Sequence, residues 1–203
     1  NVFEEIAYRP AYHSLTDNNF GLLKGAEINF LETKIRHYNQ DNKTVLQNLD
    51  LLTIRSILPA AEMFNPLSFQ IKANIERWTN SVREKEGYIG NLMIGTGKAY
   101  AFSDNIWGFA FWNNKASTGG FLPHNSMLSF GLNTGMLLDF DKWKALFEIT
   151  PWCASQKIGN MTSYRAELNY VIDTNVSVAA EALFEDRYGR DNNEFGIKLR
   201  YFF

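Results

Sequence analysis

The sequence predicts an all-β protein, an antiparallel β-barrel whose strands cross a membrane, and three observations point to this fold class. The last ten residues, Glu194 to Phe203, alternate between a polar and an apolar face with the period of a strand. Alternating runs of about 10 to 14 residues, separated by turn residues, fill the rest of the 203-residue chain. Aromatic residues make up 15% of the chain, yet no run approaches the roughly 18 to 20 consecutive apolar residues of a transmembrane helix.

The alternating runs predict eleven strands in one domain, residues 1–203, most of them joined to the next strand as a hairpin. The expected ranges are 2–9, 26–38, 45–58, 67–79, 88–100, 106–112, 127–138, 143–152, 162–172, 176–185 and 194–203. In the second run the apolar phase switches between Phe30 and Leu31, which predicts a bulge. Pro59 and Pro66 cannot continue a ladder, so they separate the third run from the fourth. Polar loops are expected at 10–22, 113–125 and 186–193.

Strand parity sets the expected orientation. Single-chain bacterial barrels have even strand numbers, short periplasmic turns and longer extracellular loops. If the loop 186–193 is extracellular, the short turns at 103–105, 139–142 and 173–174 and the C-terminus are periplasmic. The same parity starts Val2 at the outer rim and makes the first run parallel to the last. We therefore expect one strand before residue 1 and twelve strands in the parent protein.

The last four runs show which side chains would face lipid and which the lumen. Alternation turns outward Phe147, Ile149, Tyr164, Ala166, Leu168, Tyr170, Val176, Val178, Ala180, Ala182, Ile197 and Leu199. It turns inward Lys144, Glu148, Arg165, Glu167, Glu181, Glu185, Lys198 and Arg200. Opposite charges on adjacent strands can pair, so we expect a charge-filled lumen and a barrel that anchors rather than conducts.

A soluble barrel with apolar residues inside would show the same alternation with the faces reversed. The charged inner set, the C-terminal aromatic residue and the aromatic residues expected at strand ends favour the membrane. Those end residues are Trp78, Tyr100, Trp107, Trp112, Trp143 and Trp152.

Composition excludes several other classes. The net charge is −2 and no block of basic residues stands out, which argues against a nucleic-acid partner. The single Cys153 excludes an intramolecular disulfide and a multi-cysteine metal site. We expect neither a metal nor a cofactor.

The terminal strand resembles the closing strand of bacterial outer-membrane barrels, in which a terminal Phe serves as an assembly signal. The resemblance implies that Tyr201 and Phe203 form this signal. It also implies an integral outer-membrane location, with outer-membrane lipids and the barrel-assembly machinery as partners.

Two further stretches carry a second resemblance. One is Tyr8-Arg-Pro-Ala-Tyr-His-Ser-Leu-Thr-Asp17 followed by residues 25–31, and the other is residues 49–58 followed by 64–69. Over roughly residues 8–77 they resemble the C-terminal barrel of Gram-negative proteins with an Lnb-like periplasmic domain. Such proteins usually read "RPAYHDL", where this chain has His13-Ser14-Leu15. The resemblance implies an anchor for an upstream periplasmic domain, thought to be a cysteine-dependent acyltransferase or hydrolase, or for an envelope assembly. Any catalytic Cys and His would lie upstream, so Cys153 does not inherit that role, and the upstream chain would supply the missing strand.

Two alternative functions stay open at this point. Outer-membrane lipid deacylases and phospholipases carry a His-x-Ser pair on one strand, where the His takes the Ser proton for acyl attack. Alternation would place His124 and Ser126 on one face, but those enzymes continue Ser-Asn, whereas Met127 follows here. No orienting Asn or acid can be assigned either, so we expect loop residues and no catalytic role for this chain. The other alternative is a small-solute channel.

Overall fold

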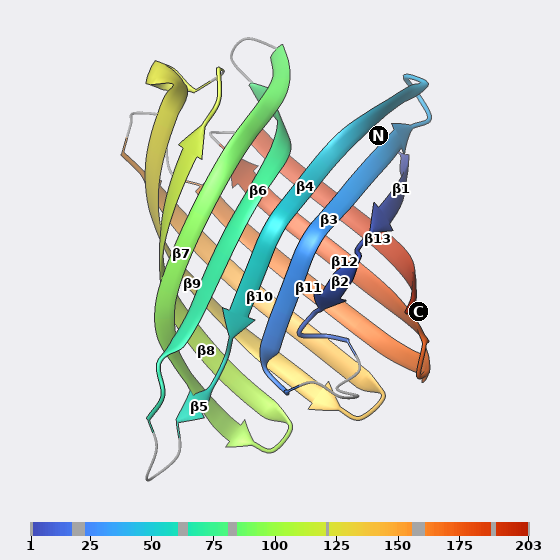
Figure 1. The fold of residues 1–203 in the computed structure, drawn as a ribbon, viewed down its shortest axis with the longest axis vertical. Coiled ribbons are helices and arrows are strands. Elements are labelled where there is room, and N and C mark those ends of the chain that lie inside the picture. The colour runs from blue at the N-terminus through green and yellow to red at the C-terminus, as the bar shows by residue number, and fades with distance from the viewer. Residues whose placement is uncertain are drawn as a thin grey trace.

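One strongly curled antiparallel sheet accounts for nearly all of the described chain (Figure 1). The computed structural model describes residues 2–17, 23–60, 65–80, 85–120, 122–155, 161–187 and 190–202. Eleven strands follow one another along the sheet: β1 (Phe3–Tyr8), β3 (Ala26–Tyr38), β4 (Lys43–Ser56), β6 (Ser68–Asn80), β7 (Lys85–Ser103), β8 (Ile106–Thr118), β9 (Ser126–Phe140), β10 (Trp143–Ala154), β11 (Met161–Asp173), β12 (Val176–Arg187) and β13 (Arg190–Tyr201). The short β2 (Ala11–His13) pairs with β3, and β5 (Pro59–Ala60) pairs in parallel with β7. The predicted all-β barrel fold with eleven strands is confirmed.

The sheet curls so far that its first strands lie in front of its last ones (Figure 1). Each neighbouring pair along the path is antiparallel, so the ten pairings leave β1 and β13 parallel to each other. Among the residues that the structure describes, no backbone ladder joins these two strands. We call the end at which β13 finishes the C-terminal rim. It carries the two-residue turns 104–105, 141–142 and 174–175.

The two faces of the sheet have opposite polarity. Polar side chains point inward and are buried, for example Asn74, Asn113 and Asn169, which are 7%, 1% and 0% exposed. Apolar side chains point outward and are exposed, for example Leu132 and Leu168, both 45% exposed. A soluble barrel hides its apolar face from water, and this sheet does the reverse.

Some element boundaries differ from the prediction. Residues 113–118 continue β8 instead of forming a loop, because the polar Asn113 and Ser117 point inward and bond to polar groups there. Residues 190–193 likewise pair with β12 as the start of β13. The bulge predicted between Phe30 and Leu31 is not there: Leu31 has a left-handed φ of 55° and both side chains are exposed, but the register of β3 against β4 continues past them and shifts between Lys34 and Ile35.

Candidate functional site in the lumen

A segment between β2 and β3, residues 14–17, folds into the lumen near the C-terminal rim, and we call it the plug. Its Thr16 and Asp17 are 1% and 2% exposed. The Thr16 hydroxyl donates to Glu167, and the Asn169 amide donates to the Thr16 carbonyl at 2.8 Å. Arg200 Nη1 lies 3.2 Å from Asp17 Oδ1. The plug is therefore held by side chains from the inner faces of β11 and β13.

Glu167 lies at the centre of a buried ion-pair network. Its carboxylate accepts hydrogen bonds from Arg200 at 2.8 Å and from Arg165 at 2.7 Å. Arg165 Nη1 also lies 3.7 Å from Glu148, which in turn binds Arg55 Nη1 at 2.7 Å. Buried charges are costly unless they are paired, and these charges are paired across β4, β10, β11 and β13.

Two branches extend this network. Lys198 of β13 pairs with Glu181 of the neighbouring strand β12. On the other side Lys144 donates to the main-chain carbonyl of Asp17, and its Nζ lies 3.7 Å from Asp139. Seven of the eight charged residues that alternation turns inward contact one another or the plug, and the eighth, Glu185, lines the cavity described below.

An apolar cluster inside the barrel completes the closure at this rim. Leu15 of the plug packs with Ile57, Ala99, Phe109, Phe111, Leu137 and Leu146, and Trp107 packs against them. Phe111 and Ile57 are fully buried. Side chains in such a cluster are packed nearly as densely as in a protein core. At the level of the plug the lumen is therefore filled with protein.

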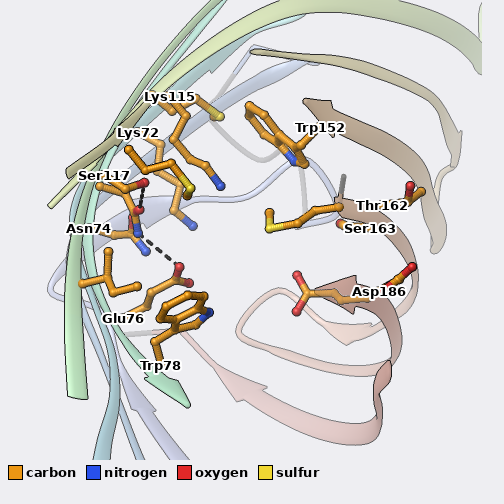
Figure 2. Close-up of a pocket in the computed structure, with 16 residues that line it drawn as sticks. Lys72, Asn74, Glu76, Trp78, Lys115, Ser117, Trp152, Thr162, Ser163 and Asp186 are labelled. Carbon is orange, nitrogen blue, oxygen red and sulfur yellow. Dashed lines mark hydrogen bonds between the residues drawn. The ribbon is translucent and has the colours of Figure 1, made fainter. Parts of the chain in front are cut away.

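Above the plug, toward the opposite rim, the lumen widens into a cavity of about 180 Å³ (Figure 2). One wall carries Lys115, Ser117, Asn74, Glu76 and Trp78, and Figure 2 shows Trp152, Thr162, Ser163 and Asp186 on the other side. Asn91 links two wall residues, since it accepts from Ser117 at 2.7 Å and donates to Glu76 at 3.2 Å. Lys115 Nζ lies 4.4 Å from the centre of the Trp152 ring. The cavity mixes both signs of charge with two indoles, so it can hold water or a small polar molecule.

Three of the six aromatic residues that were expected at strand ends point into the barrel. Trp78 and Trp152 are 9% and 8% exposed and line the cavity, while Trp107 belongs to the plug cluster. Trp152 fits inward because it lies over Gly131, where a Cβ would come within 2.6 Å of the ring. Trp112 and Trp143 face outward, with 56% and 50% of their surface exposed, and Trp112 lies in the middle of β8 and not at its end.

Those remaining sequence candidates that the structure describes do not line the cavity. His124 is in a 3-10 turn, η1 (Pro123–Asn125), with a φ of 55°, rather than in a strand. Ser126 begins β9, and its hydroxyl lies 3.5 Å from the main-chain carbonyl of His124. Cys153 and Tyr201 are exposed, and Phe203 lies outside the described residues.

A search of the described ranges finds no group of three or more His, Cys, Asp or Glu side chains that could hold a metal ion. The same part of the chain contains no helix that is both long and apolar enough to span a membrane.

Comparison with known proteins assigns the chain to a family. A family model described as "Domain of unknown function (DUF7840)" matches residues 1–202. The chain belongs to this family. No curated protein and no solved structure matches it.

Sequence reasoning missed several residues of this DUF7840 site. Thr16 and Asp17 belong to a loop without periodicity, and Asp17 meets Arg200 across 183 positions of sequence. Arg55 lies on a strand that was predicted, but no charge pattern singled it out, and Asp139 was expected in the turn 139–142 whereas it belongs to β9. One signal in the sequence could have identified Arg55 as a lumen residue: it occupies an inward position of β4, opposite Glu27 of β3.

Proposed function

We propose that this DUF7840 domain is an integral β-barrel of the bacterial outer membrane that serves as an anchor and platform for a periplasmic domain or an envelope assembly. The reversed polarity of the sheet carries the proposal. In hydrocarbon every backbone polar group must be bonded internally, which a β-barrel achieves, and its outer face must be apolar.

Strand β7 illustrates how the outer face matches a bilayer. Leu92 and Ile94, each 50% exposed, lie between Tyr88 at one end and Tyr100 at the other. The twelve residue-to-residue steps from Tyr88 to Tyr100 cover about 40 Å of strand, or about 28 Å along the membrane normal at a tilt of ~45°. That length agrees with the thickness of the hydrocarbon layer, and the tyrosines would lie at its two interfaces.

The turns support an orientation with the C-terminus in the periplasm. Outer-membrane barrels have short periplasmic turns, and the C-terminal rim carries two-residue turns after β7, β9 and β11. Connections at the opposite rim include the longer 119–125 and 155–160, besides the two-residue 188–189. The C-terminal rim also carries two long connections, from β1 to β3 and from β4 to β6, so the orientation rests on the three hairpin turns after β7, β9 and β11. In this orientation β13 ends, at Tyr201, on the periplasmic side, where the assembly machinery would read a terminal strand.

The filled lumen favours an anchor over a channel. A diffusion pore needs a continuous aqueous path, whereas here the plug, the ion-pair network and the apolar cluster occupy the lumen at the periplasmic rim. The lipid-hydrolase alternative has less support, since His124 lies in a turn with a left-handed backbone instead of beside Ser126 on a strand.

A depth-dependent substitution tests membrane insertion. Leu168→Arg places a charge midway along β11 on the outer face, and in lipid it should lower the unfolding free energy by about 2–4 kcal/mol. Tyr100→Arg, near the interface, should cost only about 0–1 kcal/mol. Both would be measured by urea titration of the domain folded into phospholipid vesicles. Leu168 and Tyr100 are 45% and 60% exposed, so in a water-soluble barrel neither change should matter, and equal small effects would refute insertion.

A further inference from the structure

The two ends of the sheet leave a gap, and we propose that one further β-strand lies in it, antiparallel to both β1 and β13. The inference rests on the proposed function, because only in hydrocarbon does an open strand edge carry a prohibitive cost. Each backbone group left without a partner there costs several kcal/mol, and β13 alone is twelve residues long.

The exposed fractions of the outward side chains locate the gap. Ile197 and Leu199 of β13 are 84% and 74% exposed, and Ile6 of β1 is 76% exposed. On β10 and β11, which have a neighbour on each side, Ile149 and Leu168 are 36% and 45% exposed. The excess on β1 and β13 corresponds to one absent neighbour on each.

Parity decides how the gap can be filled. Because β1 and β13 are parallel, joining them directly would create the one parallel closure in a sheet whose path is otherwise antiparallel. A single strand between them restores an antiparallel ladder on both sides and brings the number to an even twelve.

Side chains on the inner face already bridge the gap. Arg36 of β3 binds Glu5 of β1 and reaches across to Glu194 of β13, with its two terminal nitrogens 3.0 and 2.8 Å from that carboxylate. The two edges are therefore close enough for one intervening strand, and their inner side is polar. A strand that fits has apolar residues outward and polar residues inward.

The occupant is a segment of the same polypeptide that leads into β1. A strand antiparallel to β1 ends at the rim where Phe3 begins β1, so a short hairpin can join them, as the turn 39–42 joins β3 to β4. A strand that follows β13 would satisfy the same parity, and the crosslink described below tells the two apart.

Paired cysteines in the full-length natural gene product test the closure, in a Cys153→Ser background. The control pair Ala180→Cys with Ile197→Cys joins residues that face each other across β12 and β13, and it should form a disulfide. Ile6→Cys with Ile197→Cys would lie about 9.6 Å apart across one intervening strand, beyond the 4.4–6.8 Å that a disulfide spans, so its yield should be at least ~tenfold lower. A yield equal to the control would show direct closure of β1 on β13 and would overturn the proposal. No ladder fixes which residue of β1 lies level with Ile197. Glu4→Cys and Tyr8→Cys are therefore each paired with Ile197→Cys as well.

A photo-crosslinker identifies the occupant. Phe195→p-benzoylphenylalanine places the probe on β13, and mass spectrometry should find it joined to a peptide that precedes residue 1. The matched control is the same substitution at Phe147 on β10, which should label the strands carrying Met136 and Ala166. Crosslinks to residues 3–8, to residues beyond 203, to a second copy or to another protein would each overturn the assignment. Failure of insertion itself would show separately, in the Leu168→Arg measurement.

Discussion

Neutralising Glu167 should cost much of the stability of the barrel. Its carboxylate is 2% exposed and accepts hydrogen bonds from Thr16, from Arg200 at 2.8 Å and from Arg165 at 2.7 Å. Glu167→Gln keeps the shape but leaves the buried guanidinium of Arg200 and the partly exposed one of Arg165 with less negative charge, and its amide directs a donor at donors. Breaking a buried pair costs about 3–5 kcal/mol. In the variant, Arg200 remains paired with Asp17, and Arg165 remains near two other carboxylates. We therefore expect the unfolding free energy to fall by about 3 kcal/mol, the lower end of that range.

The assay is urea unfolding of the domain in vesicles, with Glu86→Gln as the matched control. Glu86 also binds two cations, Arg77 and Lys43, but its side chain is 42% exposed, so its loss should cost at most about 1 kcal/mol. If Glu167→Gln costs no more than Glu86→Gln, the network does not hold the plug and the argument for a filled lumen fails.

Three further predictions concern the lumen. Gly131→Ala should destabilise by about 1–3 kcal/mol, because its Cβ would lie 2.6 Å from the Trp152 ring, whereas Gly196→Ala, with nothing within 4 Å, should be neutral. Equal effects in the urea titration would contradict the inward position of Trp152. Leu15→Ala should cost about 2–5 kcal/mol through the cavity it leaves in the plug cluster, and a cost below ~1 kcal/mol would show that the plug is loosely packed. In planar bilayers the unmodified domain should give no steady open-pore current, and such a current would contradict the plugged lumen.

The sequence contained enough information for the sheet and its faces. Strand residues alternate with a period of two whatever their distant contacts, so the runs 162–172 and 176–185 were expected close to where β11 and β12 lie. The phase switch at Leu31 was visible for the same reason, since two consecutive apolar residues interrupt the period, but the register shift itself lies between Lys34 and Ile35. Alternation also assigns Glu167 and Arg200 to one face without any knowledge of their partners.

The plug could not be predicted from the same signal. Its residues belong to an irregular segment, and their positions depend on contacts with Glu167, Asn169 and Arg200, all more than 150 positions away. The predicted end of β8 was too early, because the polar residues Asn113 and Ser117 were interpreted as part of a loop. Both point into the polar lumen instead. Alternation itself turns Trp78 and Trp152 inward, since they have the parity of Asn74 and of Glu148. The space that Gly131 leaves for the Trp152 ring depends on the neighbouring strand, which alternation does not describe.

A spin-label scan of residues 178–182 on β12 tests the central claim most directly. In a Cys153→Ser background, each position carries one nitroxide, and its collision rates with oxygen and with a water-soluble nickel complex are measured in vesicles. Val178, Ala180 and Ala182 face outward, while Ala179 is fully buried inside. The membrane account predicts high oxygen and low nickel accessibility at 178, 180 and 182, with both low at 179. High nickel accessibility at those three outward positions would show that the apolar face meets water, and would contradict the account.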